Sequence, residues 1–142
     1  MKASPFQPKH LKMKNFTKIL LFTSLIFVSS ISVLAQMSGT YTVSATGSAN
    51  FNSMLAASTA LAQNGVSGPV IINIKDGTYP RFSVDSIAGT SSINTVTFQS
   101  DPSNTSQAVI EDSASSSIDN YLVYLNGCDY TVFKNLTFNA LG

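Results

Sequence analysis

The sequence predicts an all-β fold in which short strands stack as the turns of a solenoid, with one α-helix near the start of the folded part. Residues 68–79 (GPVIINIKDGTY) alternate in polarity and end in a turn dipeptide. Short runs of β-branched and aromatic residues follow, separated by Gly, Asn and Asp. Apolar positions recur 27 residues apart from Val96 to Val123. They recur 22 residues apart from Ile110 to Val132, and intervals of this size are typical of solenoids.

Residues 1–35 have the pattern of a secretory signal peptide. Five lysines precede an apolar run from residue 19 to residue 34, and small residues then form a cleavage motif between Ala35 and Gln36. A start at Met13 is also reasonable, which would make residues 1–12 an over-extended beginning. The alternative is an uncleaved membrane anchor, but a spanning helix needs about 20 apolar residues, and this run is shorter and diluted by Ser and Thr. We therefore expect a secreted or cell-surface protein with no stable membrane span after cleavage.

The charge that remains after cleavage excludes two classes of partner. Residues 36–142 contain three basic and seven acidic residues, a net charge of −4. Without basic clusters, this part of the chain is suited neither to nucleic acid nor to an anionic membrane. Cys128 is the one cysteine, so no intrachain disulfide can form, and its neighbour Asp129 has the wrong sign to activate a thiol.

The folded part is expected to begin with an extended lead-in or edge strand over residues 36–49. Residues 50–65 then predict the helix, because apolar and small side chains recur there at three-and-four spacing: Phe51, Met54, Leu55, Ser58, Leu61 and Ala62. Asn50 or Ser48 is expected to cap its start. Gly65 is expected to end it with left-handed backbone.

The remaining elements are short strands joined by turns. In the strand that follows the helix, Val70, Ile72 and Ile74 are predicted to point inward, and Gly77 lies in the turn that follows. Further strands or extended segments are predicted at residues 80–84, 95–100, 108–111, 121–125, 130–133 and 136–138. Asn126-Gly127 is also a strong hairpin signal. A hairpin in which residues 121–125 pair with residues 130–133 therefore stays open beside the stacked arrangement.

The helix and four later segments share their order with a known family. These segments are GVSGPV (65–70), DGTY (76–79), YLVYLNG (121–127) and YTVFKNLTF (130–138). In this order they resemble the start of right-handed parallel β-helix proteins of the pectin-lyase-like superfamily, most closely large secreted proteins of the Bacteroidetes group. The resemblance covers residues 50–142. It implies a capping helix and the first coils of a parallel β-helix that is incomplete at the C-terminus, so the remainder of a longer chain is expected.

The resemblance also implies a structural role for Asn135. Proteins of this family place a stacked Asn in the tight turn between two sheets, where Asn tolerates left-handed backbone. Gly77 and Gly127 are the other structural turn positions. A stack that ends near residue 142 is expected to expose apolar side chains and self-associate: Val123, Leu125, Val132, Leu136 and Phe138.

The sequence contains no catalytic constellation, and it identifies no catalytic, metal-binding or cofactor-binding residue. Family members that cleave acidic polysaccharides hold calcium with clustered carboxylates and use an Arg or Lys as base. The acidic candidates here are Glu111 with Asp112, and Asp119 with Asp129, but Glu111 and Asp112 point to opposite faces of a strand. Calcium needs six to eight oxygen ligands, so it is expected only in a full-length protein. Arg81 is the single arginine and has no motif around it.

Three interpretations of function remain. The first is an exported β-helix scaffold, the N-terminal part of a larger cell-surface or extracellular protein that engages polysaccharide. The second is a non-catalytic structural or adhesive surface protein. The third is a polysaccharide lyase or glycoside hydrolase whose active site lies beyond residue 142. Tyr121, Tyr124 and Tyr130 either form a sugar-stacking platform or pack across strands.

Overall fold

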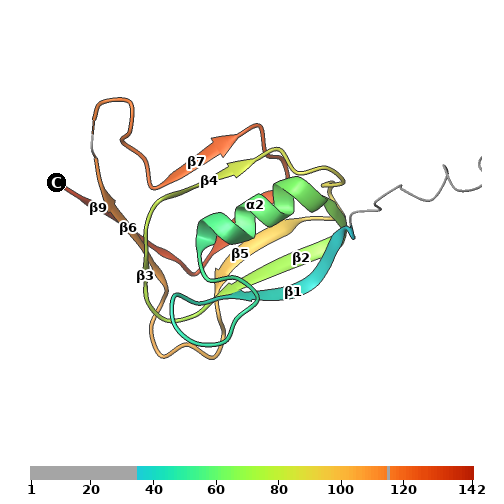
Figure 1. Ribbon diagram of the computed structural model, residues 1–142, viewed down its shortest axis with the longest axis horizontal. Helices are drawn as coiled ribbons and strands as arrows, with labels where there is room; N and C mark the ends of the chain where they lie inside the picture. The colour runs from blue at the N-terminus through green and yellow to red at the C-terminus, as the bar shows by residue number, and fades with distance from the viewer. Residues whose placement is uncertain (1–34, 115) are drawn as a thin grey trace, which may run out of the picture. The chain divides into compact units, whose positions relative to one another are not determined.

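A computed structural model describes residues 35–114 and 116–142, which contain nine strands and one helix (Figure 1). The predicted signal segment therefore lies outside the described residues, apart from Ala35. In chain order the elements are β1 (Met37–Val43), α2 (Met54–Asn64), β2 (Val66–Ile74), β3 (Thr78–Tyr79), β4 (Phe82–Asp85), β5 (Val96–Ser100), β6 (Val109–Ser113), β7 (Val123–Asn126), β8 (Thr131–Lys134) and β9 (Thr137–Leu141).

The strands form three sheets, and every named strand pair is parallel. The strand orders are β1-β2-β5-β8, β3-β6-β9 and β4-β7. Along the chain, β2, β3 and β4 occupy the three sheets in turn, β5, β6 and β7 repeat that order, and β8 and β9 begin it again. The prediction of a mostly β chain with one short helix is thus confirmed. The hairpin alternative is wrong, because β7 and β8 lie in different sheets.

The register differs from the sequence intervals. Val70, Val96 and Thr131 are consecutive partners in one row, so the intervals in the first sheet are 26 and 35 residues. Ile110 pairs with Phe138 and not with a residue of β8. The predicted intervals of 27 and 22 residues therefore joined strands that do not pair. The cause is that the loops between strands differ in length, which spaces equivalent positions unevenly along the chain.

The core lies between the sheets and beneath α2. Val70, Ile72 and Ile74 are fully buried, as their alternation predicted, and so are Val96 and Phe98 in the neighbouring strand. Helix α2 contacts β1 and β4, and Figure 1 shows its axis running nearly along the strands. Burying one face of each short strand in a shared interior supplies most of the stabilisation of such a fold.

The helix begins later than predicted. Ser53 is the N-cap, and its Oγ accepts a hydrogen bond from the backbone N–H of Ala56 at 3.1 Å. The predicted cap Asn50 instead bonds Thr42 of β1, since Phe51 continues as a bridge to β1. Leu55 was placed in the apolar stripe and is 57% exposed. The buried face is made by Met54, Ala57, Ser58 and Leu61.

Two turns use left-handed backbone at positions that the sequence singled out. Asn135 has φ 54° between β8 and β9, and Gly127 has φ 69° between β7 and β8. Gly77 has φ 144° in the turn before β3. Gly65, which ends α2, has φ 66°. Positive φ is unfavourable for most side chains, so these residue types fit their backbone positions.

Candidate functional site

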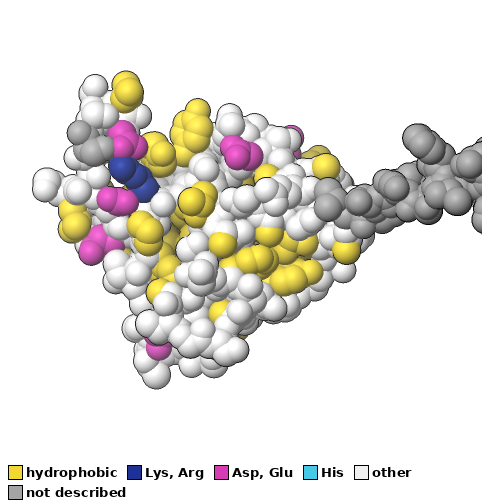
Figure 2. Space-filling view, viewed as in Figure 1, with side chains coloured by type: hydrophobic (Ala, Val, Ile, Leu, Met, Phe, Trp, Pro, Cys, Tyr) yellow, Lys and Arg dark blue, Asp and Glu magenta, His cyan; other side chains and the backbone are white. Residues whose placement is uncertain are grey.

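Arg81, in the connection from β3 to β4, is held by two aspartates, Asp112 of β6 and Asp119 of the segment that joins β6 to β7. Its Nη2 lies 2.7 Å from Oδ2 of Asp119, and its Nη1 donates a hydrogen bond to the Asp119 carbonyl oxygen at 3.0 Å. Its Nε lies 3.7 Å from Oδ2 of Asp112, which also accepts the Arg81 backbone N–H at 3.2 Å. Figure 2 shows cationic atoms between acidic ones at this end of the fold. The arrangement fixes the segment before β7 against β3 and β4.

This cluster was not anticipated from the sequence. Asp112 and Asp119 are distant from Arg81 along the chain, and only the pairing of β3 with β6 brings them together. Glu111 is bonded by the side-chain amide of Asn139, so it and Asp112 have different partners, in agreement with their predicted opposite directions. Of the other suggested pair, Asp119 with Asp129, Asp119 is engaged by Arg81.

Two tyrosines lie beside the arginine. The rings of Tyr121 and Tyr124 are 5.4 Å apart, and the Arg81 guanidinium carbon lies 5.6 Å from the Tyr121 ring centre. Tyr130 precedes β8, which belongs to another sheet. The three predicted tyrosines are therefore divided between a pair next to Arg81 and a separate residue. A cation over an aromatic face stabilises both groups by about 0.5–1 kcal/mol at an exposed position.

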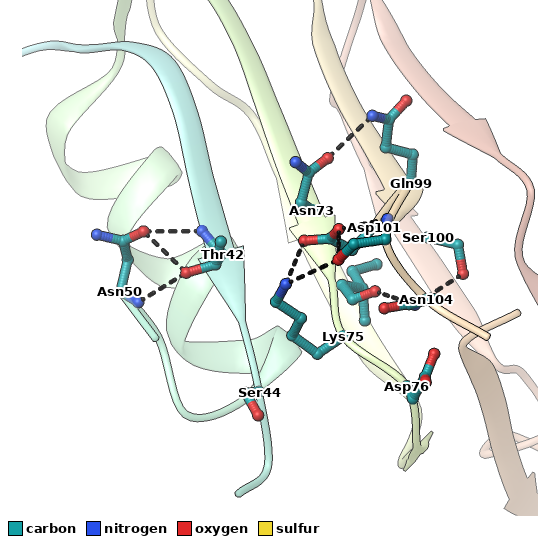
Figure 3. Close-up of polar contacts among 12 residues, drawn as sticks. Thr42, Ser44, Asn50, Asn73, Lys75, Asp76, Gln99, Ser100, Asp101 and Asn104 are labelled. Atoms are coloured by element: carbon teal, nitrogen blue, oxygen red, sulfur yellow. Dashed lines mark hydrogen bonds and ion pairs between the residues drawn. The ribbon is translucent and has the colours of Figure 1, made fainter. Parts of the chain in front are cut away.

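A second polar group lies where β2 and β5 end (Figure 3). The Lys75 ammonium is 2.8 Å from Oδ2 of Asp101, whose Oδ1 accepts hydrogen bonds from the hydroxyl and N–H of Ser103. The bonds from Lys75 and Ser103 lower the pKa of the Asp101 carboxyl to about 2. Asn104 donates to the Ile74 carbonyl oxygen at 2.8 Å. These bonds secure the turn after β5 against the end of β2.

The same turn forms one wall of a polar hollow of about 640 Å³. The residues that line it, all polar except Pro102, are Gln99, Ser100, Asp101, Pro102, Asn104, Thr105, Ser106, Gln107, Lys134 and Asn135. Lys134 lies in the same outward row as Gln99, which bonds Asn73 at 2.9 Å. Within the described part of the chain, no ion pair engages Lys134. The hollow thus combines amide and hydroxyl groups with one available cation.

Such a lining can bind a ligand, but it contains no evident catalytic group. Amides and hydroxyls both donate and accept hydrogen bonds, as sugar hydroxyls require, and an ammonium attracts carboxylates. In residues 35–114 and 116–142, no three His, Cys, Asp or Glu side chains are grouped to hold a metal ion. The hollow could not be predicted from the sequence, because its residues come from the ends of β5 and β8 and from the turn after β5, and the pairing of β5 with β8 brings them together. The adjacency of Lys134 and Asn135 in the sequence was the one available signal.

In comparisons with known proteins, no family model, curated protein or solved structure matches the chain. Among the described residues, no helix has the length and apolar character needed to cross a membrane.

Proposed function

We propose that this chain is an exported scaffold, the capped first coils of a right-handed parallel β-helix, and that it forms the N-terminal part of a larger cell-surface or extracellular protein that engages polysaccharide. The observation that carries the proposal is the cyclic order in which successive strands occupy three parallel sheets. A solenoid produces this order directly, because each coil contributes one strand to every sheet.

The closed N-terminal end supports the scaffold part of the proposal. Strand β1 extends the first sheet by one strand, and α2 contacts both β1 and β4. Terminal caps are required in solenoids because the first coil has no predecessor to bury its apolar face. Here Met54 and Leu61 of α2 are fully buried, so the helix supplies that cover.

The polar hollow supports the polysaccharide part. Its amide and hydroxyl lining suits sugar hydroxyls, and the available ammonium of Lys134 favours a chain that carries carboxylates. The exposed rings of Tyr121 and Tyr124 offer a second surface on which a sugar ring can stack. We therefore propose an acidic polysaccharide as the preferred ligand.

The two other interpretations lead to different observations. Asp101, Asp112 and Asp119 are engaged by Lys75 or Arg81, which favours a structural or adhesive role for the described coils. A polysaccharide lyase or glycoside hydrolase remains a proposal about residues beyond 142, and it predicts turnover only by a longer protein.

The test is binding of the exported chain to polygalacturonate, with a neutral galactan as comparison. Wild-type protein is expected to bind polygalacturonate more tightly. Replacing Lys134 by Gln removes one charge-assisted contact of about 1 kcal/mol, so affinity should fall roughly fivefold. Ser48→Ala, an exposed change before α2, is the matched control. Absence of binding to either polymer, or equal binding by wild type and Lys134→Gln, would contradict the polysaccharide proposal.

A further inference from the structure

Strand β8 has two different faces. On the inner face, Phe133 is the partner of the fully buried Phe98, and it also lines an apolar hollow of about 470 Å³ beside β7. Successive side chains of a strand point to opposite sides, so Val132 and Lys134 lie on the outer face. Val132 is 44% exposed there, as the sequence predicted. The outer face of β8 therefore leads directly to the ammonium in the polar hollow.

The residue before β8, Tyr130, has left-handed backbone. Its φ is 53°, and among the described residues the other positive φ outside glycine is that of Asn135, at the opposite end of β8. Asn tolerates this conformation, whereas a bulky aromatic residue in it is an outlier. Strained positions of this kind are concentrated at ligand-binding sites. Local preference therefore does not explain why a tyrosine occupies this position.

The backbone of Tyr130 is held in place, but its ring has no partner in the fold. Its carbonyl oxygen accepts the Val96 N–H at 3.0 Å, which joins the residue to β5. The side chain is 52% exposed. Within residues 35–114 and 116–142, no second aromatic ring contacts Tyr130, and nothing is hydrogen-bonded to its hydroxyl. A fixed and half-exposed ring of this kind is available to stack on a sugar.

A shallow surface joins Tyr130 to Lys134. Tyr130 comes two residues before Val132 and continues the outward alternation at the start of the strand. The ring and the ammonium belong to residues four positions apart, which is about 13 Å along an extended strand. Between them lies the row that joins Val132 to Thr97 and Ile71. These β-branched side chains are short, so the row forms no barrier to a ligand that lies along β8.

This spacing sets the length of a ligand that can use both groups. A disaccharide held at Lys134 by its carboxylate is shorter than about 13 Å and does not reach Tyr130. A chain of four sugars does. It can place one carboxylate at the ammonium and the apolar face of another ring on the tyrosine.

We propose that Tyr130 is a stacking residue of the polysaccharide site, at a subsite separate from the polar hollow, and that the ligand is an acidic chain of four or more sugars lying along the outer face of β8. The inference rests on the proposed polysaccharide binding and adds a contact residue and a chain length to it. The rings of Tyr121 and Tyr124 flank or belong to β7, in another sheet, so they are not part of this subsite.

The test compares tetragalacturonate with digalacturonate by calorimetric titration of the exported chain. Tyr130→Ala and Tyr130→Gly both remove the ring, so each should bind tetragalacturonate roughly fivefold more weakly than wild type, with digalacturonate binding unchanged. Tyr130→Phe keeps the ring and should bind both oligomers as wild type does. Ser48→Ala, an exposed change before α2, is the matched control.

Thermal unfolding separates ligand contact from support of the fold. Alanine at a positive φ retains the backbone strain and glycine relieves it, so Tyr130→Gly should unfold about 4 °C above Tyr130→Ala. If the ring contacts the ligand, the two variants lose the same affinity in spite of this difference in stability. A purely structural role predicts instead that affinity follows stability.

Three results would overturn the inference. Unchanged tetragalacturonate affinity in Tyr130→Ala and Tyr130→Gly would remove the ring from the site. Equal losses for both oligomers would mean that there is no separate subsite, and affinity that follows stability would make the tyrosine a structural residue. Binding that depends on Lys134 and persists beside any of these results would leave the proposed function standing. Absence of binding of either oligomer by wild type would contradict the proposed function as well.

Discussion

Phe98 lies at the centre of the row that joins β2, β5 and β8, and removing its ring tests whether these strands share one core. Its partners in the row are Ile72 and Phe133. The side chain is fully buried, with its ring 5.5 Å from Phe133 and 5.7 Å from Phe82. Because β5 is paired with β2 on one side and β8 on the other, its backbone cannot shift to fill the cavity left by a missing ring.

The expected cost follows from this burial. Phe98→Ala removes a fully enclosed aromatic side chain, which should lower the free energy of unfolding by about 3–5 kcal/mol. Phe133→Ala is the matched control, because Phe133 occupies the same row but lies at the apolar hollow and is only partly buried. Because the Phe133 ring is only partly enclosed, its removal should lower the free energy of unfolding by less, about 1–2 kcal/mol.

Urea unfolding followed by circular dichroism measures both variants. The midpoint should fall in the order wild type, Phe133→Ala, Phe98→Ala, with an unchanged slope, since the surface exposed on unfolding stays nearly the same. Equal effects of the two substitutions, or a cost below about 1 kcal/mol for Phe98→Ala, would refute the reasoning that β5 is enclosed between β2 and β8.

Two further predictions concern a close backbone approach and an ion pair. At Gly89, with φ 87°, an added Cβ would lie 2.1 Å from the Val66 carbonyl oxygen, whereas Gly47 has φ 86° and nothing within 4 Å. Thermal unfolding should therefore show Gly47→Ala costing about 1 kcal/mol and Gly89→Ala at least about 2 kcal/mol more, and equal costs would contradict the contact. The pKa of the Asp101 carboxyl is lowered to about 2 in the folded protein, so the ionised carboxyl stabilises the fold above its ordinary pKa. This stabilisation is lost as the pH falls from about 5 to 2. Because Lys75 is 40% exposed, we expect the ion pair to contribute about 1–2 kcal/mol to the free energy of unfolding, and Asp101→Asn should lack this contribution. The same acid dependence of stability in both proteins would count against the ion pair.

Local polarity was enough to predict much of the fold. The alternation of Val70, Ile72 and Ile74 placed β2 correctly, and the strand predicted at residues 95–100 is observed as β5. These predictions succeeded because a strand with one buried face must alternate with a period of two residues.

Pairing and sites could not be read in the same way. The rows depend on loop lengths that vary freely at the surface, so the interval from Val96 to its partner Thr131 is not marked in the sequence. Ser53 rather than Asn50 caps α2 because Asn50 is engaged by β1, a contact that local pattern does not contain. Both Arg81 and Lys134 lie in sites assembled only after distant strands have paired.

The most direct test of the stacked parallel arrangement is a set of NMR distance restraints around Phe98. The account predicts contacts from the Phe98 ring to both Ile72 and Phe133, with the flanking residues of β2, β5 and β8 in parallel register. Contacts that instead join residues 123–126 to residues 131–134 as an antiparallel pair would contradict it.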